Sequence, residues 1–124
     1  MIGEPARRRT PVHGPAGGAE PGAKHRAGFI MITGMLEIRL MVREARSLKD
    51  KRRVIKSLRD RIRNKFNVSI AEVGSLDSHQ HAVIGVAAVG NDQQFVNAVL
   101  SSVVNYISGN ADALLVDYEM EFYS

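Results

Sequence analysis

Apolar and polar residues alternate over residues 30–42, which is the pattern of a β-strand that buries one face. Over residues 48–65 the large apolar residues recur every three or four positions, as they do along one side of a helix. Ser47 precedes this segment and Asp50 follows three positions later, an arrangement typical of a helix N-terminus. We therefore predict a strand over residues 30–42 and a helix over residues 48–65.

The second half of the chain contains three further strand patterns and one helix. Residues 67–73 are rich in β-forming residues, and residues 82–89 are apolar on both faces, as in a central strand. Asp92 can cap a second helix that ends at Gly109, with an apolar stripe formed by Phe95, Val96, Val99, Val103 and Ile107. Residues 114–122 form the last strand, whose predicted buried side holds Val116, Tyr118, Met120 and Phe122.

The order of these elements, βαββαβ, predicts the fold. Its usual solution is a ferredoxin-like α+β sandwich, in which an antiparallel sheet has the strand order 4-1-3-2 and both helices cover one face. The first and last strands are then neighbours. Their pairing would bring Asp117, Glu119 and Glu121 close to Arg39 on the face away from the helices.

Residues 1–28 differ in composition from the rest of the chain. They hold all four prolines and six of the eleven glycines, with few large aliphatic residues. Such a segment cannot bury enough apolar surface to offset the entropy of ordering it. We predict a disordered tail over residues 1–28 and one folded domain over residues 29–124.

Composition limits the possible classes of protein. Of the 124 residues, 44% are hydrophobic and none is cysteine. These values fit one globular domain and exclude disulfides and cysteine-ligated zinc. No apolar run approaches the roughly 20 residues that a membrane helix needs. We expect a cytoplasmic protein with no membrane partner.

Positive charge is concentrated in one part of the chain. All 17 lysines and arginines lie at or before Lys65. The charged side chains of residues 66–124 are therefore carboxylates alone, with histidine counted as neutral. Basic side chains gain affinity for phosphates by releasing condensed counterions, so a polyanion is the first partner to consider. Within the first predicted helix, six cations share one arc of roughly 120° at 100° per residue. These predicted nucleic-acid-binding residues are Lys49, Arg52, Arg53, Lys56, Arg59 and Arg63.

Two interpretations of this arc remain open. Charged stripes are common on surface helices, where long side chains cover the edges of the core. A surface that serves only solubility normally mixes both signs, however, and Asp60 is the one acid within the arc. If the partner is RNA, contact with its backbone is favoured over base stacking, because most of the seven aromatic residues fall on predicted buried faces.

The sheet face away from the helices is a second candidate surface. Its predicted residues are more apolar than a face in contact with water should be. We predict that a homodimer partner or another protein covers this face. The predicted interface residues are Met31, Met35, Met41, Val83, Ala87 and Val89.

The sequence predicts no catalytic residues, no metal site and no cofactor. Asp77, Ser78, His79 and His81 are of suitable types, but neighbouring residues of one hairpin cannot converge on a single reacting atom. His79 and His81 would supply two ligands where zinc needs three or four.

Three stretches closely resemble the YlxP-like family of small bacterial proteins: SLKDKRRVIKSL at residues 47–58, FNVSIAEVG at residues 66–74 and GVAAVGND at residues 85–92. The resemblance extends from Ile30 to the C-terminus. It implies a ferredoxin-like fold, a cytoplasmic bacterial protein, and genes near those of translation initiation factor two and ribosome-binding factor A. It supplies no catalytic residues, because the function of the family is unknown.

The chain departs from the family at two places. The family usually begins near Met31, so either Met1 or Met31 can be the start. Where the family often has Trp-Gln-Arg, this chain has His79, Gln80 and His81.

These observations favour a non-enzymatic RNA- or ribosome-associated accessory factor that binds the phosphate backbone through its basic helix. The alternative is a protein-interaction or small-ligand regulatory module that dimerises through its open sheet face. Both remain open because a fold does not by itself determine a function.

Overall fold

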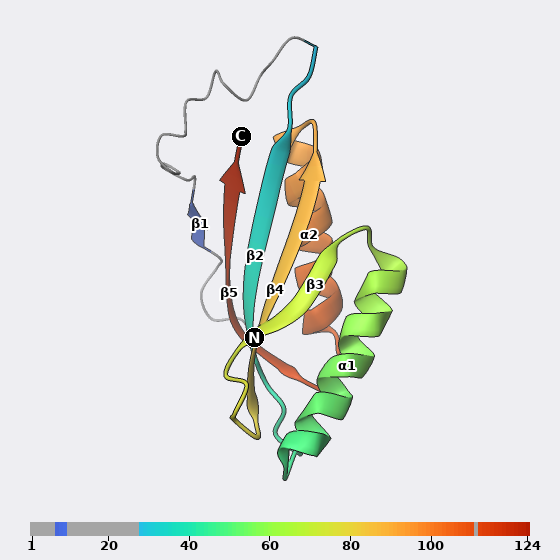
Figure 1. Cartoon of the computed structure of the whole chain (residues 1–124), viewed down its shortest axis with the longest axis vertical. Coiled ribbons are helices and arrows are strands. Elements are labelled where there is room, and N and C mark those ends of the chain that lie inside the picture. Colours follow the sequence, from blue (N-terminus) through green and yellow to red (C-terminus); the bar gives the residue numbers. More distant parts are fainter. Residues whose placement is uncertain (1–6, 10–27, 111) are drawn as a thin grey trace.

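The computed structural model describes residues 7–9, 28–110 and 112–124 (Figure 1). In these ranges the strands are β1 (Arg7–Arg9), β2 (Ile32–Met41), β3 (Ser69–Gly74), β4 (His81–Gly90) and β5 (Leu114–Tyr123), and the helices are α1 (Leu48–Lys65) and α2 (Gln93–Ser108). The bounds of α1 are those that the periodicity predicts. The other predicted elements are present within a few residues of their expected places.

The strands form one sheet in the order β1-β5-β2-β4-β3. β2 pairs antiparallel with both β4 and β5, and β3 pairs antiparallel with β4. The four predicted strands therefore have the order 4-1-3-2, which confirms the ferredoxin-like α+β fold. Burial alternates along β2 and β4 because the helices cover one face of the sheet (Figure 1). The uncovered face is called the open face below.

Strand β1 lies at the β5 edge of the sheet and was not predicted. Its backbone pairs in parallel with β5, with Arg7 opposite Glu119 and Arg9 opposite Glu121. Residues 1–6 and 10–27 of the predicted disordered tail lie outside the described residues. Disorder of that tail stays a prediction.

Side-chain caps explain where the two helices begin. The backbone N–H of Asp50 donates to Ser47 Oγ at 3.1 Å, and Asp50 Oδ2 in turn accepts from the N–H of Arg46 at 3.1 Å. At α2, the N–H of Phe95 donates to Asp92 Oδ2 at 3.1 Å. Each cap satisfies N–H groups that have no partner inside the helix, so both predicted helix starts are confirmed.

The core lies between the sheet and the helices, and one glycine sets how closely α2 approaches. A Cβ atom at Gly34 of β2 would lie 2.6 Å from Val96 Cγ1 and 2.8 Å from Leu100 Cδ1. Because both contacts are too short for carbon atoms, only glycine allows α2 to lie this close to β2. The buried residues of α2 are Val96, Leu100, Val103, Val104 and Ile107.

Phe95 does not belong to this core, so the predicted stripe on α2 is wrong at this position. Its side chain is 58% exposed. Phe95 lies in the first turn of α2, where the chain has just left β4, and the close neighbour beneath it is Gly90. Leu100 and Val104 fill the core positions that the predicted stripe left out.

The predicted burial of Val116 is also wrong. Arg39 pairs with Asp117 and Leu40 pairs with Leu115, so Val116 is the extra residue of a β-bulge. A bulge shifts the alternation of side chains along a strand by one position. Leu115 is therefore in the core, whereas Val116 is 46% exposed.

Candidate nucleic-acid interface

Helix α1 lies beside β3 (Figure 1). Its inner side packs on the core through Ile55, Leu58 and Ile62, all of them buried. The opposite side of the helix faces solvent. This placement fixes the backbone of α1 on the domain and leaves its outer side chains accessible to a partner.

The six predicted nucleic-acid-binding residues all lie on the outer part of α1. Five of them are exposed, and Arg59 is half-buried. We call this set, Lys49, Arg52, Arg53, Lys56, Arg59 and Arg63, the basic face. The structure thus brings the six side chains to one side of a single helix, and their binding to nucleic acid stays a prediction.

Two carboxylates partly neutralise the basic face. Asp60 lies 2.9 Å from Lys56 Nζ and 3.5 Å from an Arg63 nitrogen, and Asp50 lies 3.8 Å from Arg53. The hydrogen bond from Lys56 is the main reason why the pKa of Asp60 lies below its ordinary value. Asp60 therefore remains an anion at neutral pH. Exposed ion pairs of this kind are weak, so another anion can replace the carboxylate beside the cation.

The other three cations of the basic face have no such partner. Among the described residues, no carboxylate lies within ion-pair distance of Lys49, Arg52 or Arg59. The Nε atom of Arg59 is buried and has no hydrogen-bond partner. The basic face as a whole keeps a net positive charge.

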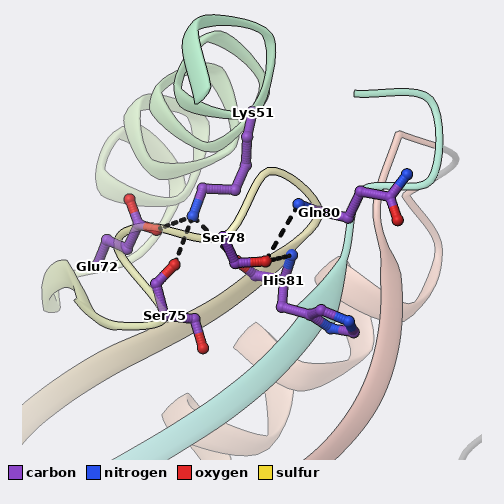
Figure 2. A network of polar contacts seen from close by, with 6 residues as sticks. All are labelled: Lys51, Glu72, Ser75, Ser78, Gln80 and His81. Carbon is purple, nitrogen blue, oxygen red and sulfur yellow. Dashed lines mark hydrogen bonds and ion pairs between the residues drawn. The ribbon is translucent and has the colours of Figure 1, made fainter. Parts of the chain in front are cut away.

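Lys51 is a cation of α1 that does not belong to the basic face. It is fully buried and was missed by the sequence analysis (Figure 2). Its Nζ atom donates to the carbonyl oxygens of Ser75 at 2.8 Å and His81 at 2.9 Å. It also lies 2.9 Å from Glu72 Oε2, an ion pair in which that oxygen accepts no hydrogen bond. Two carbonyl acceptors and one carboxylate surround the ammonium group. Lys51 thus ties α1 to the β3–β4 hairpin.

The turn of this hairpin is shaped around the buried lysine. Ser75 has a positive φ of 57°, which residues other than glycine rarely adopt. Its carbonyl accepts both from Lys51 and from the N–H of Ser78, and Ser78 Oγ accepts from the N–H of His81 at 2.9 Å (Figure 2). Gln80 Nε2 donates to the carbonyl of Arg43 at 3.2 Å. The turn therefore holds both α1 and the segment that precedes it.

The sequence did contain a signal for Lys51. It shares the helical phase of Ile55, Leu58 and Ile62, so the periodicity placed it on the buried side. What it could not supply was the partner set, because Glu72 and the two carbonyl groups come from the hairpin. We therefore assign Lys51 to positioning α1 rather than to binding.

The predicted interface residues lie at the open face, with different exposure. Met35 and Val89 are exposed on β2 and β4, and Met31 is exposed just before β2. Met41, Val83 and Ala87 are half-buried. Met35 pairs with Ala87 in the sheet. The expected apolar surface is therefore present, and whether a partner covers it stays a prediction.

A groove of about 410 Å³ runs over the open face. Ala71, Gly85 and Ala87 are among the small residues that line it, and Met35 and Val73 are its exposed large apolar residues. Val73 is the extra residue of a second β-bulge, on β3, and a Cβ atom at Gly85 would lie 3.2 Å from Val73 Cγ1. The lack of a side chain at Gly85 therefore leaves room for Val73.

Acidic residues follow one side of the open face. Arg39 lies 2.9 Å from Glu37 and 3.5 Å from Asp117, which confirms the predicted proximity of Arg39 to Asp117 of the last strand. Glu119 and Glu121 line the groove, opposite Glu37 and Met35 in the sheet. Carboxylates thus outnumber cations among these residues of the open face, whereas cations predominate on the outer side of α1.

Histidine residues form no cluster with acids in the described part of the chain. There, no group of three histidine, aspartate or glutamate residues is placed to hold a metal ion. His81 is exposed, and it contacts Lys51 through its backbone carbonyl rather than through its imidazole. In the same described residues, neither α1 nor α2 is long and apolar enough to cross a membrane.

Comparison with known proteins identifies the family. Residues 33–120 match the family described as "Protein of unknown function (DUF503)". The chain belongs to this family. It is 39% identical over 74 residues to "Uncharacterized protein YlxP" from Bacillus subtilis (strain 168), and the aligned part covers 60% of this chain and 80% of that relative. The resemblance to the YlxP-like family is confirmed, and the match to DUF503 includes α1 with its basic face.

Proposed function

We propose that this protein is a non-enzymatic RNA- or ribosome-associated accessory factor that binds the phosphate backbone through the basic face of α1. The observation that carries the proposal is the presence of three cations, Lys49, Arg52 and Arg59, without a carboxylate partner among the described residues. An unpaired stripe of one sign repels itself, and a polyanion relieves that repulsion.

The dimensions of the basic face suit a nucleic-acid backbone. From Lys49 to Arg63 the helix rises about 21 Å at about 1.5 Å per residue, with a cation or a pair of cations on each turn. Long side chains on a helix held by the core and by Lys51 can reach a row of phosphates while the backbone stays in place. Arg43 and Arg46, both exposed, extend the positive surface beyond the start of α1.

Contact with the backbone is favoured over base reading by the composition of the sheet. Strands β2, β3 and β4 contain no Phe, Tyr or Trp, so the part of the open face that these three strands form lacks the aromatic side chains on which single-strand readers stack bases. The exposed Phe95 lies on the helix side of the sheet. Recognition by shape and phosphate contacts is the mode that these residues support.

The test compares two double charge reversals on the same helix. Lys49→Glu with Arg52→Glu changes two unpaired cations of the basic face. Arg61→Glu with Lys65→Glu makes the same change of net charge on the other flank of α1. Binding is measured by fluorescence anisotropy with duplex RNA and by sedimentation with ribosomal subunits, at several salt concentrations.

We expect the wild-type affinity to fall with salt with a log-log slope of about −4 to −5, given six phosphate contacts at roughly 0.7–0.9 counterions each. The first double reversal should flatten the slope by about 1.5 to 2 and lower the affinity at least about tenfold, whereas the control keeps the steep slope. Equal binding by the two double variants, or no wild-type binding at low salt, would refute the proposal. Circular dichroism checks that each variant is folded.

A further inference from the structure

The open face has the features of a surface that can bind a copy of itself. A twofold interface uses the same patch on both chains, so that patch must contain both projections and hollows. Here the exposed side chains of Met35, Val73 and Val89 project beside a groove of about 410 Å³ lined by small residues such as Gly85 and Ala87. Projection and hollow thus occur on one surface.

Charge distinguishes a second copy from other occupants of the open face. The face carries one arginine, Arg39, and the carboxylates Glu37, Asp117, Glu119 and Glu121, so a twofold contact would place the Arg39 of each copy against carboxylates of the other. Contact between two α1 helices would instead bring like charges together. A nucleic acid is a poor occupant, because Glu37, Glu119 and Glu121 line the groove.

The size of the open face is near the lower limit for a specific dimer. Four strands at about 4.8 Å spacing, of up to about 33 Å in length, cover about 600 Å² on each copy. Two copies would bury about 1,200 Å² in total, which is the lower end of the range for stable protein interfaces. A reversible dimer that depends on concentration is therefore expected.

We propose that the open face is the interface of a twofold homodimer. Because α1 and α2 lie on the other side of each sheet, face-to-face association leaves both α1 helices outside the interface (Figure 1). The proposal of a dimer does not depend on the proposed RNA function. If both hold, one dimer presents two phosphate-binding surfaces on opposite sides and can join two RNA segments.

The first test measures molar mass. Sedimentation equilibrium of the full chain over a wide concentration range should show a transition from the 13.6 kDa monomer to twice that mass. Met35→Glu and Ala87→Glu should each weaken dimerisation at least about thirtyfold, because they place a charge in the contact. The matched control is Leu76→Glu, since Leu76 is 53% exposed, close to the 47% of Met35, but lies in the β3–β4 turn.

A second test does not depend on how well the charged variants fold. The chain has no cysteine, so Ala87→Cys introduces a single thiol on the open face and Leu76→Cys introduces one in the turn. A short bis-maleimide should link Ala87→Cys chains into dimers and leave Leu76→Cys chains monomeric. A wild type that stays monomeric at all concentrations would overturn the proposal. So would a dimer that the two charged variants do not weaken, or crosslinking at position 76 in place of position 87.

Discussion

The two helices cover the same sheet, yet their outer sides differ completely. Both bury a stripe of aliphatic residues against the core. Helix α1 also carries nine basic residues and two aspartates, whereas α2 contains no charged residue from Gln93 to Ser108. Since α2 folds onto the sheet without any charge, packing of a helix on this sheet does not require the exposed cations of α1. Their concentration on one helix supports the proposed anionic partner.

The same comparison can be made between two lysines of α1. Lys49 is exposed and has no carboxylate partner among the described residues, whereas Lys51, two positions later, is fully buried with two carbonyl acceptors and an ion-pair partner. A rotation of about 200° around the helix separates them. One charge thus serves the structure, and the other is available for binding. Charge counts along the sequence do not separate these two roles.

The largest effect on stability is expected from a charge placed in the buried apolar stripe that the two helices share. Leu58 on α1 and Leu100 on α2 are both buried, so Leu58→Glu and Leu100→Glu each place an unpaired charge in the core. Each should cost about 5 kcal/mol or more, which is comparable to the whole stability of a small domain. Urea titration followed by circular dichroism measures it. A cooperative transition that survives in only one variant would show that the two helices are not equally required.

A smaller loss of stability is expected for the buried lysine. Lys51→Met should cost about 3–5 kcal/mol, because Glu72 and the carbonyl of His81 lose their charged partner. Lys49→Met should change the free energy of unfolding by less than about 0.5 kcal/mol. The combined variant Lys51→Met with Glu72→Met should recover part of the loss, since it leaves no unpaired carboxylate. Equal stability of the two single variants would contradict the structural role of Lys51.

The smallest effect concerns the anion within the basic face. Asp60→Asn removes the shared partner of Lys56 and Arg63, so RNA affinity should rise and the log-log salt slope should steepen by up to about 1 to 2. Asp77→Asn removes an equal charge from the exposed hairpin turn and should leave both values unchanged. If both substitutions change binding alike, only net charge matters and the basic face has no specific role.

The same variant gives a pH test. The pKa of Asp60 is lowered in the folded protein, chiefly by the hydrogen bond from Lys56, so its contribution to stability is present above the ordinary carboxyl pKa of 3.8. That contribution is lost as the pH falls through the lowered value. The wild type should therefore be slightly more stable than Asp60→Asn near neutral pH, and the difference should disappear in acid. A difference that grows in acid would contradict this assignment.

Local patterns were enough to predict the elements and the basic face. The period of two over residues 30–42 and the helical period over residues 48–65 depend on neighbouring positions along the chain, and so do the caps at Ser47 and Asp92. The six cations share one arc because of helix geometry alone. From these elements, the order βαββαβ was sufficient for the sheet order and the fold.

Other features were decided only when distant segments met. Lys51 is satisfied by a carboxylate and two carbonyl groups from the β3–β4 hairpin, and no periodicity along α1 contains them. The bulges at Val73 and Val116 follow from pairing with β4 and β2, and they change which side chains are buried. The sequence therefore determined which elements form and which helix side is charged. Tertiary contacts determined which groups satisfy the buried lysine and where the open face is hollow, because these depend on partners far apart in the chain.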